Sequence, residues 1–344
     1  MRANYARRIE RDDRRMIKSR IPAVLRFLRR RLWQVAPVVF GSALLNFLIL
    51  QLAPGDVVDV LAGEAGAATP EYMARLRADF GLDRPVPVQL YHYLKNTAML
   101  DLGFSFRQNM PVLQLILERL PATLVLMIAA MSCAVFLGLL LGVISARYVH
   151  RAADRVISVF VLVTYALPTF WLGLMAIVLF SAKLGWLPSS GMADISVEHT
   201  GLAYLQDVAR HTLLPALTLA TFYLAVYTKL IRTAMLEYFG ADFIRTARAK
   251  GATEARITLF HALRNALLPL MTMLGLQLGS ILSGAVLVES VFSWPGLGRL
   301  AFESILARDF NLLLGILLFS SLLVTILNIC VDVVYAFLDP RIEL

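Results

Sequence analysis

The stretch LPATLVLMIAAMSCAVFLGLLLGVISA, residues 120–146, contains no Asp, Glu, Lys or Arg. At a helical rise of about 1.5 Å per residue, such a stretch is long enough to cross the hydrocarbon core of a bilayer, which is about 30 Å thick. Within lipid the backbone has to satisfy its own hydrogen bonds, which favours a helix. The stretch therefore predicts a transmembrane helix.

The composition of the whole chain agrees with a membrane protein. Of its 344 residues, 58% are hydrophobic and only 17% are charged, and the mean hydropathy is +0.69. This is too apolar and too poor in charge for a soluble domain. Cys133 and Cys330 both lie in apolar stretches and lack the spacing of a disulfide framework or a metal site, so we interpret them as packing residues.

Five further segments have the same character, so the sequence predicts an all-α integral membrane protein with six transmembrane helices. The predicted spans cover residues 32–53, 120–146, 156–182, 211–229, 265–288 and 310–334. The fourth span is short and needs Lys229 and Arg210 to extend to the headgroups. We expect the first span to be retained and not cleaved as a signal peptide, because its basic N-terminal region is too long and LQLAPGD lacks an A-x-A site.

The basic residues predict the orientation of these spans. With the N-terminus in the cytoplasm, 23 of the 33 Lys and Arg residues lie in the cytoplasmic segments or at their membrane edge. The positive-inside rule therefore places both termini in the cytoplasm. The predicted cytoplasmic segments are 1–31, 147–155, 230–264 and 335–344, and the predicted extracytoplasmic segments are 54–119, 183–210 and 289–309.

Two of these segments carry recognisable local signals. Residues 1–31 end in three consecutive arginines before the first span, which predicts an amphipathic elbow that binds lipid headgroups. In the first outer segment, Thr69 followed by Pro70 is typical of a helix start, with Thr69 as the N-cap. We expect that helix to end near Gly81.

A basic segment, DFIRTARAKGATEARITLFHALRNALLP, interrupts the apolar pattern at residues 242–269. Residues 242–250 suit a short helix, with an acid near its positive N-terminus and basic residues near its C-terminus. Gly251 then stands where a helix C-cap needs a positive φ angle.

A second helix is predicted to begin at Thr253 and to end at about Leu263. Ile257 and Phe260 are three residues apart on it, which predicts a narrow apolar edge beside basic residues. A short exposed helix of this kind suits docking into a groove on another protein. A loop whose charges only fix its topology is the simpler alternative, whereas binding of DNA is disfavoured because both helix ends are tethered to the bilayer.

The basic segment resembles the cytoplasmic "EAA" loop of the membrane subunits of ABC importers, whose consensus is E-A-A-x-x-x-G-x(9)-I-x-L-P. Gly251 corresponds to the glycine and Ala247 to the second alanine. Arg245 and Thr246 replace the Glu and the first Ala, and Arg264 stands in place of the proline. RTARAKG and HALRNALLP are similar to the version of this loop in peptide and nickel permeases.

Three further stretches extend the resemblance over most of the chain. They are DLGFS with PVLQLILERLPATL within residues 101–124, ESVFSWPGLGRL at 289–300 and DVVYAFLDPRI at 332–342. The chain thus resembles the B-type permease of the dipeptide, oligopeptide and nickel subfamily. This resemblance implies the type I ABC importer permease fold, with an ABC transmembrane type-1 domain over residues 115–338.

The resemblance implies that the helix after Gly251 couples the permease to an ATPase. The residues expected at that interface are Arg245, Ala247, Arg248, Lys250, Gly251, Ala252, Glu254, Arg256, Ile257 and Phe260. The arginines and Lys250 would meet acidic or carbonyl groups of the ATPase, and Gly251 would permit the turn.

The resemblance also implies partners and a location. It implies a second homologous permease, two ABC ATPase subunits and an extracytoplasmic binding protein, in the cytoplasmic (inner) membrane of a bacterium or archaeon. The chain has no G-x-x-x-x-G-K-[ST] motif, so we expect no cofactor and no enzymatic activity on it, with ATP and Mg on the ATPases. We expect no nucleic-acid partner, because the basic loop is tethered to the bilayer. The implied substrates are dipeptides or oligopeptides, and nickel, glutathione, glycosides or opines remain alternatives.

Other polar residues are candidates for the pore or for the outer gate. Gln277, Asn328 and Asp332 are candidates for lining a pore or for hydrogen bonding between helices. Small residues spaced by four, at Gly138/Gly142 and Gly275/Gly279, favour close helix packing. The candidates for an outer gate or for docking of the binding protein are Glu289, Phe292, Trp294, Pro295 and Gly296. For that stretch, the alternative is a Trp at the headgroup level next to a Pro-Gly turn.

Two other classes of function are weaker. A proton-coupled carrier that works alone would need acids in the middle of spans, whereas Glu289 and Asp332 lie at span ends. An intramembrane enzyme is disfavoured because the sequence contains neither H-E-x-x-H nor G-x-S-x-G.

Overall fold

The structure is a computed structural model that describes residues 35–52, 69–79, 82–194 and 200–338, together with the single positions 33, 58 and 196. The predicted elbow within 1–31 and most of the C-terminal tail lie outside the described residues. Side chains after Val331 are also outside them, so the prediction for Asp332 is not tested.

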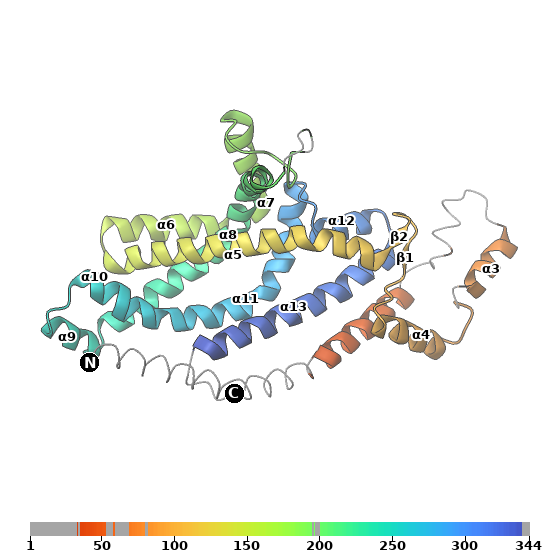
Figure 1. Cartoon of the computed structure of the whole chain (residues 1–344), viewed down its shortest axis with the longest axis horizontal. Coiled ribbons are helices and arrows are strands. Elements are labelled where there is room, and N and C mark those ends of the chain that lie inside the picture. The colour runs from red at the N-terminus through yellow and green to blue at the C-terminus, as the bar shows by residue number, and fades with distance from the viewer. Residues whose placement is uncertain are drawn as a thin grey trace.

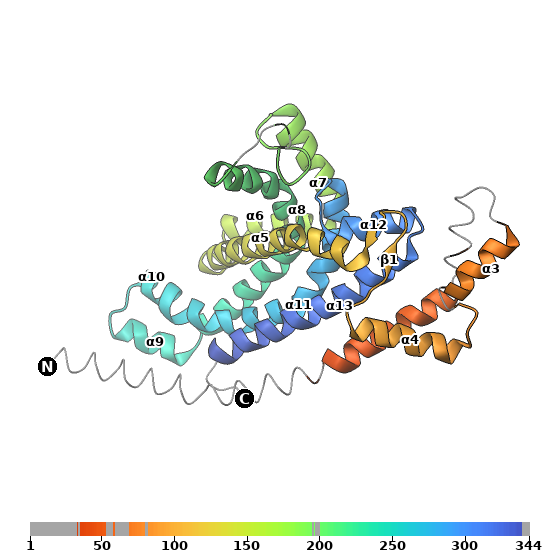
Figure 2. The same cartoon turned by 45° about the vertical axis from the view of Figure 1, so that its right-hand side comes forward.

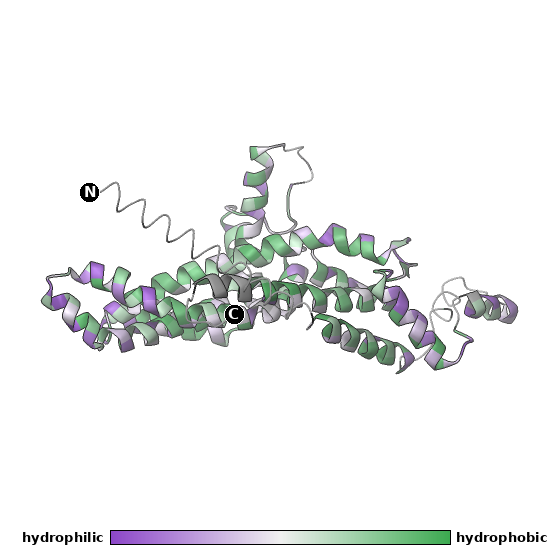
Figure 3. Cartoon of the chain, turned by 60° about the horizontal axis from the view of Figure 1, so that its bottom comes forward, coloured by the Kyte–Doolittle hydropathy of each residue, from purple (hydrophilic) through white to green (hydrophobic). Residues whose placement is uncertain are grey.

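Long apolar helices dominate the described part of the chain, which confirms the predicted all-α membrane fold (Figure 1). Among the described residues, five helices are long and apolar enough to cross a membrane, and a bent helix pair can supply a sixth span. The five are Val35–Leu52, α5 (Val112–Arg147), α8 (Leu202–Phe239), Glu254–Gln277 and α13 (Phe310–Leu338). Figure 3 shows these helices as mainly hydrophobic, with hydrophilic residues frequent at the two ends of the molecule.

The third predicted span is not one straight helix. It consists of α6 (Ala152–Ala166) and α7 (Thr169–Ala176), and α7 continues as a π-helical stretch, Ile177–Lys183. The two parts meet at an angle of 106°. Leu167 adopts extended backbone angles because the following Pro168 disfavours the helical conformation of the residue before it. The prediction of a continuous helix over 156–182 is therefore wrong.

The centre of the bundle is the contact between α5 and α8 (Figure 1). Added Cβ atoms at Gly138 and Gly142 would lie 2.7 Å from the Tyr227 Cβ and 2.8 Å from the Ile231 Cβ. Because real Cβ atoms are not found so close to another heavy atom, only glycine lets these helices approach this far. The predicted packing role of this glycine pair is confirmed.

Helix α8 extends beyond the predicted fourth span at both ends. Its first turns fall in the predicted loop 183–210, and its last ones fall in the predicted loop 230–264. Only the central part of α8 is free of charged residues. The length of that uncharged stretch is therefore shorter than the length of the helix.

The described part of the predicted outer segment 54–119 contains two short helices and a hairpin, followed by the first residues of α5. Helix α3 (Pro70–Asp79) begins as predicted, since Tyr72 N donates to Thr69 Oγ1 at 3.3 Å. Helix α4 (Val86–Ala98) leads to an antiparallel pair, β1 (Phe104–Ser105) and β2 (Met110–Pro111), in which Phe104 pairs with Pro111 and Ser105 with Met110.

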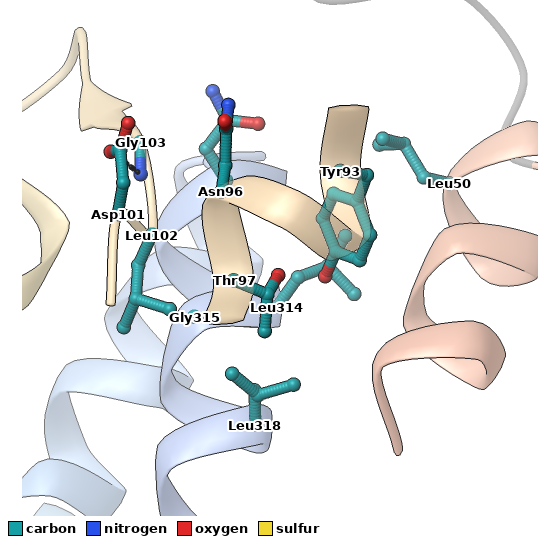
Figure 4. A pocket seen from close by; sticks show the side chains of 11 residues that line it. Leu50, Tyr93, Asn96, Thr97, Asp101, Leu102, Gly103, Leu314, Gly315 and Leu318 are labelled. Atoms are coloured by element: carbon teal, nitrogen blue, oxygen red, sulfur yellow. Dashed lines mark hydrogen bonds between the residues drawn. The ribbon is translucent and has the colours of Figure 1, made fainter. Parts of the chain in front are cut away.

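A small cavity of about 150 Å³ lies where this outer segment meets the bundle (Figure 4). Tyr93 and Thr97 of α4 and Leu314 and Leu318 of α13 line it. Next to it, Asn46 Nδ2 of the first helix donates to Leu314 O at 3.0 Å. These contacts hold the first helix and α4 against α13.

The loops fall at opposite ends of the long helices. Two short helices, α9 (Asp242–Ala249) and α10 (Glu254–Arg256), lie at one end (Figure 2). The hairpin, α4 and the short helix α12 (Leu297–Leu306) lie at the other. Between them runs α11 (Leu263–Val291), which continues from α10 through a π-helical stretch, Ile257–Ala262.

Candidate partner-binding loop

The basic loop, defined here as residues 240–264, has the predicted helix–glycine–helix form. Helix α9 confirms the first predicted helix to within one residue, and Gly251 has φ +77° as predicted. Gly251 N donates to Arg248 O at 2.9 Å and Ala252 N to Ala247 O at 3.1 Å, which together form a Schellman C-cap. No atom lies within 4 Å of an added Cβ at Gly251, so backbone conformation and not crowding requires glycine there.

The second helix starts as predicted but does not end at Leu263. Thr253 caps it, because its Oγ1 accepts a hydrogen bond from Arg256 N at 3.4 Å. From Glu254 the chain remains helical through the π-helical stretch and on through α11 to Val291. The loop is therefore continuous with a membrane helix.

The π-helical stretch also changes which residues face outward. Ile257 is fully buried in the same cluster as Ile244, whereas Phe260 is 69% exposed. A π-helix has more residues per turn than an α-helix, so residues spaced by three no longer share a face. The predicted common edge of Ile257 and Phe260 is therefore wrong, and the exposed apolar residues are Phe260 and its neighbour Leu259.

An ion-pair cluster ties the loop to α5. The Glu254 carboxylate accepts hydrogen bonds from Arg147 Nη1 and from Arg248 Nε, both at 2.8 Å. Arg147 is the last residue of α5, and Arg248 belongs to α9. Hydrogen bonding to Glu254, together with its charge, raises the pKa of Arg248. The sequence did not reveal this cluster, because Arg147 lies 107 residues away from Glu254 in the chain.

The basic residues predicted at the ATPase interface fall into two groups. Arg248 pairs with Glu254, and Arg245 lies 3.4 Å from Asp242, so both are partnered within the chain. Lys250 and Arg256 are exposed and make no ion pair or side-chain hydrogen bond within the described part of the chain. Among the predicted interface residues, Lys250 and Arg256 are therefore the cations without a described partner, in the same loop as the exposed Phe260.

Of the smaller predicted interface residues, Ala247 and Ala252 are half-buried against the core, and only Gly251 is exposed. Ala247 and Ala252 therefore stabilise the loop by packing inside it.

A buried ion pair supports the bundle near this loop. Asp154, at the start of α6, is 5% exposed and accepts from Arg232 of α8 at Nε (2.8 Å) and Nη2 (2.9 Å). The Ser145 hydroxyl and the His150 N–H donate to the same carboxylate. Three helices, α5, α6 and α8, thus meet at one carboxylate. Asp154 falls within the predicted cytoplasmic segment 147–155 and was not a candidate residue, although an acid in the first turn of a helix is a recognisable signal.

The predicted outer-gate stretch forms an internal clamp. Glu289 is fully buried, and its carboxylate accepts from Thr123 Oγ1 at 2.8 Å and from Arg299 N at 2.9 Å. Thr123 Oγ1 in turn accepts from Leu297 N at 2.7 Å. The first turn of α12 is thereby fastened to α5. An added Cβ at Gly296 would lie 2.3 Å from the Glu289 carboxyl group, so the clamp requires glycine.

Burial shows how this stretch is placed within the chain. Trp294 is fully buried and its Nε1 donates to Ala122 O at 2.8 Å, so its ring packs inside the bundle, and the gate role stays a prediction. The side chains of Glu289, Phe292 and Trp294 are covered, and in this conformation they offer no surface to a binding protein. Pro295 is half-buried in the same turn.

The two amide side chains predicted within spans lie on α11 and α13. Gln277 Oε1 and Asn328 Oδ1 are buried and have no hydrogen-bond partner among the described residues. The two helices approach closely here, since Cβ atoms added at Gly275 and Gly279 would lie 3.1 Å from Val331 and Val324. Whether these amides line a pore stays a prediction.

Several membrane helices, one of them continuous with a basic loop, are the architecture of a membrane protein of the permease class. Residues 138–344 match the family described as "Binding-protein-dependent transport system inner membrane component", and residues 24–127 match its N-terminal companion. Since the first match covers more than half of the chain, the chain belongs to this family.

Curated relatives match almost the full length of the chain. The di/tripeptide transport system permease protein DppB of Pseudomonas aeruginosa is 40% identical over 334 residues, which cover 93% of this chain and 99% of the relative. The dipeptide transport system permease protein DppB of Escherichia coli K12 is 39% identical over 337 residues, with the same coverage. A solved structure of the MetNI methionine ABC transporter, in an inward-facing conformation, contains a chain that is 19% identical, with a TM-score of 0.53. That likeness covers 66% of this chain and 97% of the other, and it supports the fold.

Proposed function

We propose that this chain is a pore-forming permease subunit of an ATP-driven (ABC) importer for dipeptides or oligopeptides. The near full-length similarity to two permeases named for di- and tripeptide transport supports this substrate class. The partners in this proposal are a second homologous permease, two ATPase subunits and an extracytoplasmic binding protein. ATP and Mg bind to the ATPases, and this chain carries neither.

The observation that carries the proposal is the form of the basic loop. Lys250, Arg256 and Phe260 extend from one short stretch and are exposed. Unpaired cations beside an aromatic residue suit a groove with acidic or carbonyl groups and an apolar floor. In the proposal this groove belongs to the ATPase.

The structure suggests how movement of the ATPase would reach the transmembrane region. Because the chain stays helical from Glu254 to Val291, in our proposal a displacement of α10 is passed on to α11. Glu254 links the loop to the end of α5, and Glu289 at the far end of α11 holds the Thr123 hydroxyl of α5. The same two helices are thus joined at both ends, so in our proposal they move together.

The test is coupling in the assembled transporter reconstituted in liposomes. We expect Gly251→Pro and Arg256→Glu to keep the chain in the membrane while uncoupling ATP hydrolysis from peptide uptake. Arg155→Glu is the matched control, because Arg155 is an exposed basic residue on α6, outside the basic loop. Normal uptake per ATP in both loop variants would refute the docking role.

A further inference from the structure

The break in the third span leaves main-chain groups without hydrogen-bond partners. Helix α6 runs along α5, whereas the stretch Thr169–Lys183 leaves at 106° to α6 (Figure 1). The Thr164 carbonyl loses its helical partner because Pro168 has no N–H. The carbonyl groups of residues 165–167 and the N–H groups of residues 169–171 make no hydrogen bond to any residue that the structure describes.

The break lies at membrane depth. The Tyr165 ring stacks on Phe222 with the ring centroids 5.1 Å apart, and Phe222 lies well inside the uncharged part of α8. On the other side of the break, an added Cβ at Gly173 would lie 3.3 Å from Thr218, one turn further along α8. At this depth, irregular backbone is tolerated only where protein buries it or where it lines a water-filled cavity.

The described part of the chain does not bury the break. The side chains of Tyr165, Phe170 and Trp171 are 51%, 45% and 42% exposed, and Pro168 is exposed between them. The Tyr165 hydroxyl also has no hydrogen-bond partner within the described ranges. A hydroxyl and several unpaired main-chain groups at one place in the apolar layer are unfavourable unless water or a polar ligand reaches them.

A cavity connects the break with the edge of the bundle that carries the basic loop. Its volume is about 870 Å³, and it lies between α5, α6, α8 and α11. Tyr165 lines it at the break, and Ser145, Lys229 and Arg232 line it at the other end. Along α6 it extends from Ile157 to Tyr165, which is about 12 Å of helix. This polar-ended route favours water at the break over burial by a second subunit.

We propose that the break and this cavity form part of the path of the transported substrate, and that the unpaired N–H and C=O groups at the break bind the main chain of a peptide. A peptide main chain carries the same two kinds of group, so it pairs with both whatever its side chains are. The inference rests on the proposed function for the class of substrate, and it adds a binding site within this subunit.

Cysteine accessibility in the assembled transporter tests the position of the path. Ala166→Cys and Thr169→Cys, one on each side of the break, would be placed in a chain whose Cys133 and Cys330 are replaced by Ala, in inside-out vesicles. We expect a charged, membrane-impermeant methanethiosulfonate reagent to label both. Val159→Cys is the control and should stay unlabelled, because Val159 is exposed on α6 but does not line the cavity. Absence of label at both break positions, or a cross-link from them to the second permease, would overturn the proposal.

Protection from labelling tests the binding of a peptide main chain. Dialanine should slow the labelling of Ala166→Cys. Alanylsarcosine, whose amide has no N–H, should protect with about fivefold lower affinity, the loss expected for one hydrogen bond. Equal protection by the two compounds, or none by dialanine, would overturn the peptide site.

A parallel measurement separates this inference from the proposed function. ATP-driven transport of dialanine would be measured in proteoliposomes from the same preparation. Absence of transport by the native complex would refute the proposed function. Intact transport without protection of Ala166→Cys by dialanine would refute only the site at the break.

Discussion

Replacing Asp154 by Asn should destabilise the folded chain strongly, because Asp154 is a buried acid that serves three helices. The carboxylate is 5% exposed and receives two hydrogen bonds from Arg232, one from Ser145 and one from His150 N. The substitution keeps the size of the side chain but removes its charge and one of its two acceptor oxygens.

The expected magnitude follows from the surroundings of Arg232. Removing one partner of a fully buried ion pair costs about 3–5 kcal/mol. The Arg232 side chain is 28% exposed and can regain some water, so we expect a loss of about 2–3 kcal/mol. At about 2–4 °C per kcal/mol for a large chain, Tm should fall by about 4–12 °C.

A thermal unfolding scan in detergent measures this shift, with Asp242→Asn as the control. Asp242 also faces an arginine, but the partners are 95% and 74% exposed, so its loss should cost less than about 1 kcal/mol. The double variant Asp154→Leu with Arg232→Met should recover part of the loss, because no charge is then left unpaired. Equal melting temperatures for Asp154→Asn and Asp242→Asn would contradict the assigned role of the buried pair.

Two further substitutions probe the two links between α11 and α5. Glu254→Gln should lower peptide uptake per ATP severalfold with little change in Tm, since exposed ion pairs contribute little to stability. Glu237→Gln, at an exposed acid on α8, is its control, and uptake per ATP that is equal in both variants argues against the link. Gly296→Ala should destabilise by about 1–3 kcal/mol, because its Cβ would lie 2.3 Å from the Glu289 carboxyl group. Gly41→Ala is the control, because open space surrounds the added Cβ, and it should not destabilise the chain. Equal Tm values for Gly296→Ala and Gly41→Ala would show that the clamp tolerates a side chain.

The features predicted correctly from the sequence are those set by local chemistry. Uncharged runs of sufficient length predicted the membrane helices, because in lipid each spanning segment must satisfy its own backbone hydrogen bonds. Thr69, Thr253 and Gly251 predicted helix ends, since capping and positive φ depend on only a few neighbouring residues.

The features that were missed depend on geometry that composition does not encode. Pro168 lies inside an apolar run, so a count of charges passes over the bend that it causes. The π-helical stretch shifts the outward face from Ile257 to Phe260, and the sequence periodicity gave no warning of it.

Long-range contacts account for the remaining differences. Glu289 and Trp294 looked like a surface at the membrane edge, yet they are buried by partners on α5 more than 160 residues away in the chain. Glu254 likewise finds Arg147 across 107 residues. Single-sequence reasoning can name such residues as noteworthy but cannot supply their partners.

Site-specific cross-linking tests most directly whether the basic loop docks on an ATPase. A cysteine at position 260 or 257 would be introduced into a chain whose Cys133 and Cys330 have been replaced by Ala, within the assembled transporter in membranes. We expect Phe260→Cys to cross-link to the ATPase and Ile257→Cys, which is buried on the same helical stretch, not to cross-link. Absence of an ATPase cross-link from position 260 in every nucleotide state would contradict the central claim.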